Sequence, residues 1–180
     1  KHAVVIGASM AGIKVVEVLH KYGIETWLLD LASYIFPLAA YKEVAKEIEK
    51  RVEAQGVHLM FGVTIDHMEQ ENGEKTAVLT DGSRIPADIV GLCIGTRAIT
   101  ETVQGEVEIG RGIVVDDHMR TSVPGIYAAG DCCEGNNLES GQNQIIGLWA
   151  NANHQGETAG INMAGGDMTY KGNILHNITH

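Results

Sequence analysis

The sequence predicts an α/β fold in which a three-layer unit is followed by a second unit that repeats its organisation in a lesser form. Two observations carry this prediction. An apolar strand runs directly into a glycine turn and a helix over residues 4–12, and the next strand ends in an acidic residue, Asp30. A weaker strand-and-helix order recurs beyond Gly105. With 180 residues and 44% hydrophobic composition, the chain is long enough to bury a core.

The segment from Gly7 to Gly12 has the spacing of a nucleotide-binding turn. Gly7 permits backbone angles that a side chain forbids, and Gly12 lets the helix pack closely on the sheet. The N–H groups at the helix start can hold a pyrophosphate, although Ser9 stands where the usual pattern has its middle glycine. Asp30 is placed to accept hydrogen bonds from an adenosine ribose diol, which favours NAD over NADP.

We therefore predict a Rossmann-like three-layer nucleotide-binding unit that binds NAD. The alternative is a plain structural turn, because glycines end strands in many folds. The residues predicted to contact NAD at this turn are Gly7, Ala8, Ser9, Met10, Ala11, Gly12 and Asp30.

The elements that follow are those of such a unit. The first helix is predicted over residues 11–21, and the second parallel strand over residues 25–30. Residues 38–55 predict an amphipathic helix that covers one face of the sheet, because apolar residues recur on one side with Lys and Glu between them. Residues 57–61 predict a short strand.

A small antiparallel crossover sheet is predicted next, from residues 63–68, 76–80 and 84–85. Residues 87–94 are a nearly continuous apolar run, which is typical of a strand buried on both faces. This run ends at Gly95 and Thr96, which we expect to approach the bound NAD. The alternative for these two residues is an ordinary strand-to-loop turn.

The boundary between the two units is predicted within residues 96–105, which are polar and show little periodicity. An NAD-binding domain then covers residues 1–101, and a second domain covers residues 102–180. In the second domain the pattern predicts strands over residues 112–116 and 126–129, and a helix rich in small residues over 151–164.

Charge and composition exclude several classes of function. The net charge is -10 and the pI is near 5.2, without any basic cluster, which argues against nucleic acid and anionic membrane surfaces. No apolar stretch approaches the roughly 20 residues needed to span a bilayer, and no signal peptide is visible. Three cysteines are too few for a disulfide framework. We expect a cytoplasmic protein and, from the two ends of the chain, a piece of a longer one.

A second motif, Thr-Ser-Val-Pro-Gly-Ile-Tyr-Ala-Ala-Gly-Asp, occupies residues 121–131. It resembles the second flavin signature of the pyridine nucleotide-disulfide oxidoreductase family. Residues 148–156 and 159–166 follow at the proper distance and are similar to segments of the NADH oxidase and rubredoxin reductase branches. The resemblance covers essentially the whole chain.

A strand that ends in Gly130 and Asp131 places a carboxylate at the crevice where open α/β sheets bind ligands. The resemblance implies that Asp131 holds the ribityl chain of FAD, and the alternative is a turn cap. The helix beginning near Asn151 would direct its positive end at the isoalloxazine. The predicted FAD contacts are Gly130, Asp131, Leu148, Trp149 and Ala150, with a place in the core as the alternative for Trp149.

The resemblance further implies an FAD-dependent NADH oxidoreductase, in which NADH passes hydride to flavin and the reduced flavin serves a small-molecule or redox-protein acceptor. This chain would supply the NAD unit and the returning half of the FAD domain. The opening half and the C-terminal domain, through which the family usually forms a homodimer, would be absent, and the chain alone would be inactive. No residue is predicted to be catalytic. A non-enzymatic NAD-binding module with an interaction surface is the alternative.

Two residues depart from the family's pattern near the nicotinamide. Met10 replaces an aromatic residue, and Lys14 replaces a Glu. We hypothesise that Lys14 interacts with reduced flavin or with a partner carboxylate, and the alternative is a solvated lysine. Adjacent Cys132 and Cys133 suit packing better than a disulfide, a metal site or a redox sensor, and Cys93 is expected in the core. No metal site is predicted.

Overall fold

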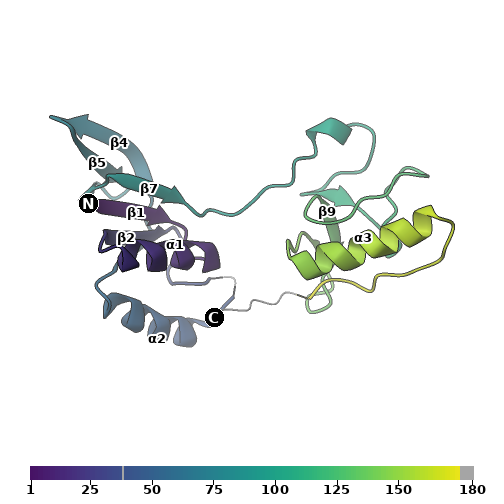
Figure 1. Ribbon diagram of the computed structural model, residues 1–180, viewed down its shortest axis with the longest axis horizontal. Helices are drawn as coiled ribbons and strands as arrows, with labels where there is room; N and C mark the ends of the chain where they lie inside the picture. Colours follow the sequence, from purple (N-terminus) through teal and green to yellow (C-terminus); the bar gives the residue numbers. More distant parts are fainter. Residues whose placement is uncertain (38, 175–180) are drawn as a thin grey trace. The chain divides into compact units, whose positions relative to one another are not determined.

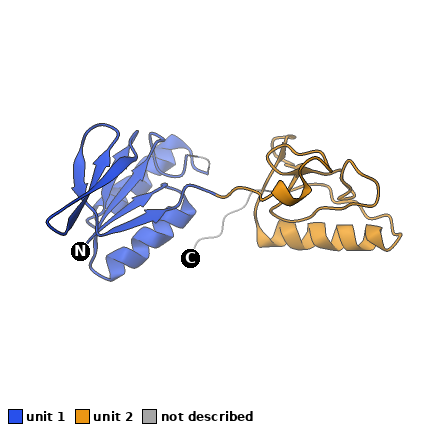
Figure 2. Ribbon diagram, turned by 90° about the horizontal axis from the view of Figure 1, so that it is seen from above, with its two compact units in different colours: residues 1–95 blue, residues 96–180 orange. Residues whose placement is uncertain are grey.

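The computed structural model describes residues 1–37 and 39–174. The chain divides into two compact units, residues 1–95 and 96–180 (Figure 2). Each unit has its own hydrophobic core. Leu38, the first residue of the predicted amphipathic helix, lies outside the described residues.

The first unit is built on a four-stranded parallel sheet (Figure 1). Its strands lie in the order β3-β2-β1-β7. Because β1 is an inner strand, the glycine turn that follows it lies between the ends of β2 and β7. The four strands are β1 (His2–Ile6), β2 (Glu25–Asp30), β3 (His58–Phe61) and β7 (Ile89–Leu92).

Two helices, α1 (Met10–Lys21) and α2 (Lys42–Glu53), cover one face of this sheet (Figure 1). They contribute Val16 and Ala45 to a core cluster that also contains Val5 of β1. The second helix begins later than predicted because residues 31–37, 39 and 40 form bends and turns. One of these turns is fixed to the glycine turn, where the Phe36 N–H donates to the Ala8 carbonyl at 2.8 Å.

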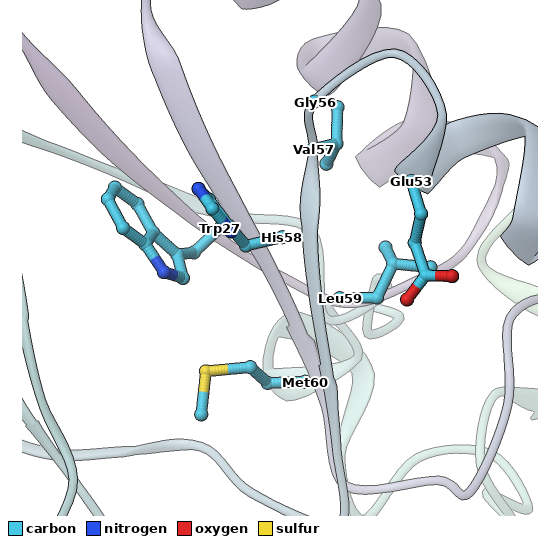
Figure 3. A pocket seen from close by; sticks show the side chains of 7 residues that line it. All are labelled: Trp27, Glu53, Gly56, Val57, His58, Leu59 and Met60. Carbon is cyan, nitrogen blue, oxygen red and sulfur yellow. The ribbon is translucent and has the colours of Figure 1, made fainter.

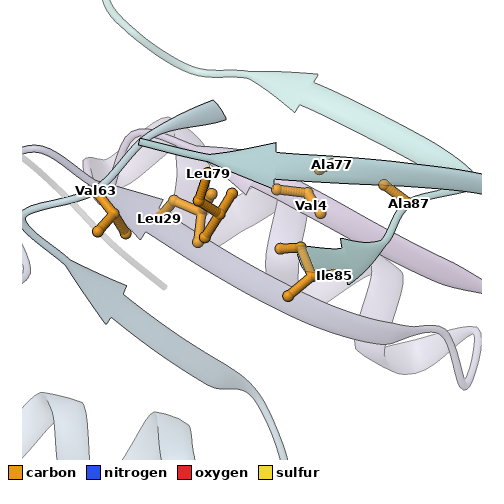
Figure 4. Close-up of a cluster of buried hydrophobic side chains, with 7 residues drawn as sticks. All are labelled: Val4, Leu29, Val63, Ala77, Leu79, Ile85 and Ala87. Atoms are coloured by element: carbon orange, nitrogen blue, oxygen red, sulfur yellow. The ribbon is translucent and has the colours of Figure 1, made fainter. Parts of the chain in front are cut away.

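A three-stranded antiparallel sheet covers the opposite face, in the order β4-β5-β6. Alternate strand residues point to opposite faces, so Val4 and Leu29 face this small sheet and not the helices. They pack against Ala77, Leu79 and Ile85 (Figure 4). The predicted crossover sheet is therefore confirmed, with strands β4 (Ile65–Glu71), β5 (Glu74–Leu79) and β6 (Arg84–Pro86).

The strand β7 differs from its prediction. It was expected to be buried on both faces, but Ile89, Val90 and Leu92 are exposed, Leu92 by 67%. The reason is the strand order, since β7 pairs only with β1 and forms the edge of the sheet. A continuous apolar sequence indicates burial only when elements cover both faces of the strand.

The second unit contains a small sheet of order β10-β9-β8 and one long helix, α3 (Trp149–Met163). Its core is centred on Ile113, Met119, Ala128, Cys133 and Ala159. The remaining elements are the 3-10 helix η1 (Glu101–Val103) and the strands β8 (Ile113–Val114), β9 (Cys133–Asn136) and β10 (Asn143–Gln144).

The predicted strand over residues 126–129 does not form. One edge of the segment is bonded, since the Ala128 N–H donates to the Met119 carbonyl at 3.2 Å. Within the described part of the chain, the N–H groups of Tyr127 and Ala129, which point the other way, have no hydrogen-bond partner. A strand needs a neighbour on its edge, and the described residues supply none on this side.

Candidate nucleotide-binding sites

The glycine turn after β1 admits no side chain at either of its outer glycines. Gly7 has a φ of +107°, and a Cβ there would lie 2.2 Å from the Cys93 carbonyl oxygen. A Cβ on Gly12 would lie 1.8 Å from the Gly7 carbonyl oxygen. The turn, the end of β7 and the start of α1 therefore touch through their backbones.

Among the described residues, no side chain caps the N–H donors at the start of the helix α1. Ser9 occupies the N-cap position without forming a side-chain cap, and the first turn contains no acidic residue. The N–H groups of Met10, Ala11 and Gly12 precede the first intrahelical bond, which runs from Ile13 to Ser9 at 3.0 Å. Such a helix start can receive an anionic phosphate.

Asp30 is fixed beside this turn by two backbone donors. Its carboxylate accepts the Ala8 N–H at 2.7 Å and the Ala32 N–H at 2.8 Å, one on each oxygen. An ionised carboxylate has about four acceptor positions, so two remain for ribose hydroxyls. The Ala8 N–H is consumed within the fold, and so it is not among the donors left for a pyrophosphate.

Among the described residues, the segment after β7 meets the glycine turn at Cys93, and neither Gly95 nor Thr96 makes a backbone hydrogen bond to that turn. The Cys93 N–H donates to the Ile6 carbonyl at 2.7 Å, and Gly95 follows two residues later with open space around its Cα. Thr96 begins the second unit. The Cys93 side chain is half-buried and packs at the margin of the core, as expected.

Lys14 lies on an exposed face of α1 and forms an ion pair with Glu17 at 3.0 Å. Glu17 also pairs with Lys21 at 2.9 Å, and the hydrogen bonds from Lys21 and Lys14 lower the pKa of Glu17 to about 2. This ion pair is the arrangement expected of a solvated surface lysine.

In the second unit, the structure brings the Gly130–Asp131 turn and the start of α3 together. A Cβ on Gly147 would lie 3.1 Å from an Asp131 carboxylate oxygen, and a Cβ on Gly130 would lie 3.6 Å from that of Ala152. Among the described residues, no hydrogen-bond donor reaches the exposed Asp131 carboxylate. Its interpretation as a turn cap is therefore wrong.

The helix α3 begins at Trp149, whose side chain is 83% exposed. The alternative that Trp149 fills the core is therefore wrong. Leu148 and Ala150 are half-buried on either side of it. Leu148 is the N-cap residue, and its side chain makes no cap hydrogen bond. The first N–H groups of α3 therefore have no side-chain cap.

Cys132 and Cys133 are free and pack in the second core. Their thiols donate to the carbonyls of Ala129 and Gly130, both at 3.3 Å. Burial raises the pKa of Cys133 to about 12, which suppresses the reactive thiolate. Packing, and not redox sensing, is the role that this environment favours.

A row of buried polar residues on α3 was not anticipated from the sequence. Four side chains at helical spacing face the core: Asn151, Gln155, Thr158 and Asn162. The signal was present, because polar residues recurring every three or four positions mark one helix face. Because the buried face of a helix is ordinarily apolar, a polar face of this kind predicts exposure to solvent.

Two hollows lie away from these predicted contacts. The first, of about 420 Å³, lies beside β3 (Figure 3), where the ring of His58 stacks on Trp27 with centroids 4.6 Å apart. The second, of about 590 Å³, lies in the second unit and includes Asp116, Asp117 and Tyr170.

Among the described residues, one group has the composition of a metal site: Asp116, Asp117 and His118. Asp116 already accepts the backbone N–H groups of His118 and Arg120, at 2.9 and 2.8 Å, and so it serves to fix a turn. In the same described part of the chain, no helix is long and apolar enough to cross a membrane.

Comparison with known proteins identifies relatives along the whole chain. The family model described as "Pyridine nucleotide-disulphide oxidoreductase" matches residues 1–156. An NADH oxidase of Streptococcus pyogenes serotype M6 is 30% identical over 172 residues, which are 93% of this chain and 37% of that protein. A rubredoxin-NAD(+) reductase of Pseudomonas putida is 31% identical over 139 residues, covering 75% of this chain and 36% of that protein.

Solved structures agree with these relatives. The water-forming NADH oxidase from Lactobacillus brevis, bound to NADH, is 30% identical with a TM-score of 0.89, over 94% of this chain and 38% of that one. The chain thus spans little more than a third of the length of the proteins it resembles.

Proposed function

Because the chain belongs to the pyridine nucleotide-disulphide oxidoreductase family, we propose that it is the NAD(H)-binding portion of an FAD-dependent NADH oxidoreductase. Residues 1–101 form the NAD-binding domain, and residues 102–180 form the second half of the FAD-binding domain. One observation carries the proposal most strongly. The glycine turn and the uncapped helix start approach each other through their backbones, and the Asp30 carboxylate is bonded to the same turn at the edge of the sheet.

The residues of the first unit bind and orient the dinucleotide. Backbone N–H groups at the start of α1 receive the pyrophosphate, and Gly7 and Gly12 permit the close backbone contacts that hold the turn against Cys93 and the helix. Asp30 accepts hydrogen bonds from the adenosine ribose. The same carboxylate repels a 2′-phosphate, so NADH is preferred over NADPH. Met10 and Gly95 line the path toward the nicotinamide.

The second unit fits a flavin. Asp131 offers an exposed carboxylate without a hydrogen-bond donor among the described residues, which suits the hydroxyl groups of a ribityl chain. The uncapped start of α3, with Leu148, Trp149 and Ala150, offers N–H donors and a positive helix end for the ring. When bound, FAD supplies the chemistry that accepts hydride from NADH and passes the electrons onward.

The electron acceptor is a small molecule or a redox protein. Relatives of both kinds occur, since one is named an NADH oxidase and another a rubredoxin-NAD(+) reductase. In the full-length protein, the remaining half of the FAD domain completes the flavin site, and a homodimer is the expected assembly. The 180-residue chain by itself is inactive.

A visible spectrum of the purified chain with equimolar FAD, before and after addition of NADH, tests this proposal together with calorimetric titration of NADH. We expect NADH to bind and the flavin bands to remain those of free FAD. Bound-flavin bands that NADH bleaches would show that the chain is itself a complete flavoprotein. Absence of NADH binding would overturn the assignment of residues 1–101. Binding of NADH by a full-length protein that holds no FAD would favour a non-enzymatic NAD-binding module.

A further inference from the structure

Gln155 lies at the centre of the buried polar row of α3. Its side chain is only 2% exposed. Its Oε1 accepts the Gly130 N–H at 2.7 Å, and its Nε2 donates to Asn173 Oδ1 at 3.0 Å. A buried carboxamide with both ends bonded is held in a single orientation.

The direction of this carboxamide is fixed by chemistry. A backbone N–H can only donate, so the atom facing Gly130 must be the oxygen of Gln155. The nitrogen then faces Asn173, which is 1% exposed and also accepts the Tyr170 hydroxyl at 2.8 Å. The Asn173 Nδ2 atom is left without a partner among the described residues.

Gly130 is held on both of its peptide groups. The Gly130 N–H donates to Gln155 Oε1, and the Gly130 carbonyl accepts the Cys133 N–H at 3.1 Å. Asp131 follows directly, and its carboxylate lies against Gly147. The backbone that carries Asp131 therefore has little freedom, although the Asp131 side chain itself is bonded to nothing among the described residues.

We propose that Gln155 is the positioning residue of Asp131: by holding the Gly130 N–H, it aims the Asp131 carboxylate at the hydroxyl groups of a polyol ligand. The proposal deepens the proposed function and rests on it in one respect, namely that the polyol is the ribityl chain of FAD. Gln155 itself touches no ligand, and it acts through Gly130.

The test compares two substitutions at this position. Gln155→Leu removes the acceptor of Gly130 and the donor to Asn173 while keeping a similar volume. Gln155→Glu keeps the oxygen that accepts the Gly130 N–H, and the protonated form of the buried Glu keeps a donor, its hydroxyl, for Asn173 Oδ1. Thr158→Val is the matched control, since Thr158 is equally buried on the same helix face but bonds only to the His154 carbonyl, at 2.9 Å.

Two measurements are made on each variant. Amide hydrogen exchange at Gly130 and the ¹³C shift of the Asp131 carboxyl are recorded in the 180-residue chain. The FAD dissociation constant is recorded in the full-length protein. We expect Gln155→Leu to accelerate Gly130 exchange and weaken FAD binding by roughly tenfold each, with Gln155→Glu and Thr158→Val near wild type.

The possible outcomes separate the two hypotheses. If Gln155→Leu leaves Gly130 exchange or FAD affinity at the wild-type value, the positioning role is overturned. If Thr158→Val weakens FAD binding as much as Gln155→Leu does, the effect is general packing, and the role is again overturned. If the unaltered full-length protein binds no FAD, the proposed function fails, while the exchange and ¹³C data still decide whether Gln155 positions Asp131.

Discussion

At the scale of one residue, Gly12 shows why the turn requires glycine. The position where its Cβ would lie is 1.8 Å from the Gly7 carbonyl oxygen, and a backbone atom cannot rotate away. We expect Gly12→Ala to lower the free energy of unfolding by about 1–3 kcal/mol, as overpacking does. Urea denaturation measures this change.

The matched control for that substitution is Gly160→Ala. Gly160 also lies within a helix, but no atom lies within 4 Å of its Cβ position. Because alanine favours a helix over glycine by roughly 0.5–1 kcal/mol, this variant should be slightly more stable than wild type. Equal effects at Gly12 and Gly160 would contradict the close approach in the turn.

We propose that Asp30 sets the preference for NADH over NADPH. Replacing it with Asn removes the negative charge and leaves only one oxygen for two backbone donors, those of Ala8 and Ala32. We expect Asp30→Asn to weaken NADH binding by roughly tenfold and to weaken NADPH binding less. Calorimetric titration with each nucleotide measures the ratio, and Asp66→Asn, an exposed acid on β4, serves as control. An unchanged ratio would remove Asp30 from the ribose site.

The sequence predicted the position of Asp30, but it did not predict the hydrogen bonds of Asp30 and Gln155. The sequence placed Asp30 beside the turn but did not reveal that the Ala8 N–H is consumed by its carboxylate, because that bond spans 22 residues and depends on strand pairing. Gln155 was missed for a related reason. Its partners, Gly130 and Asn173, come from segments that meet only in the folded unit.

At the scale of elements, His118 joins two loops of the second unit. Its Nδ1 bonds to Asp117 at 2.7 Å and its Nε2 to Asp167 at 3.0 Å, and these bonds, that of Asp117 foremost, raise the pKa of His118. A raised pKa means that the stabilisation is fully present below the ordinary value, about 6.5, and is lost as pH rises through the higher folded value.

The melting temperature should therefore fall between pH 6 and pH 8 by an amount that His118→Gln reduces. Asp117→Asn should flatten the same slope, and the double variant should flatten it no further than the larger single effect. Thermal melts at closely spaced pH values measure the slopes. A slope unchanged in both single variants would show that the exposed carboxylates contribute nothing to stability.

The segment 126–129 yields a prediction about exchange. Ala128 donates to the Met119 carbonyl, whereas Tyr127 and Ala129 have no acceptor among the described residues. In the 180-residue chain, we expect the amides of Tyr127 and Ala129 to exchange faster than that of Ala128. Nuclear magnetic resonance after transfer to D₂O measures the three rates. Equal protection at all three positions would mean that both edges of the segment are paired.

Element prediction succeeded where a segment and its partners lie within the chain. The strand over 25–30 begins after the turn at Gly23, and the helix over 151–164 ends just before Gly165. Both follow local patterns and form within two residues of the expected bounds. The strand over 126–129 and the burial of β7 failed because both depend on neighbours. An apolar strand sequence is suited to a position that neighbouring strands and helices cover. The described residues cover these two segments only in part.

At the scale of the whole molecule, the two units differ in how much of a candidate binding site each contains. The first unit holds the glycine turn, the helix start and Asp30 that we propose to bind the dinucleotide, with cores on both faces of its sheet. The second offers a carboxylate, a helix start and a strand segment bonded on only one of its edges. This chain spans 37% of the NADH oxidase to which it is compared, and we propose that the remainder of such a protein completes the flavin site.

This division predicts where NADH acts. A ligand that binds only the folded state at 100 times its dissociation constant stabilises that state by about 2.7 kcal/mol. We expect NADH to slow hydrogen exchange in the turn over residues 7–13 and around Asp30, because its contacts lie there. Peptides from residues 107–135, which contain Asp131, should be unaffected in the 180-residue chain. Mass spectrometry of exchanged peptides measures both regions at once, with Asp30→Asn as the weak-binding control. Protection that falls on residues 107–135 and spares the turn would place the dinucleotide at the Gly130–Asp131 turn and overturn the assignment of the two units.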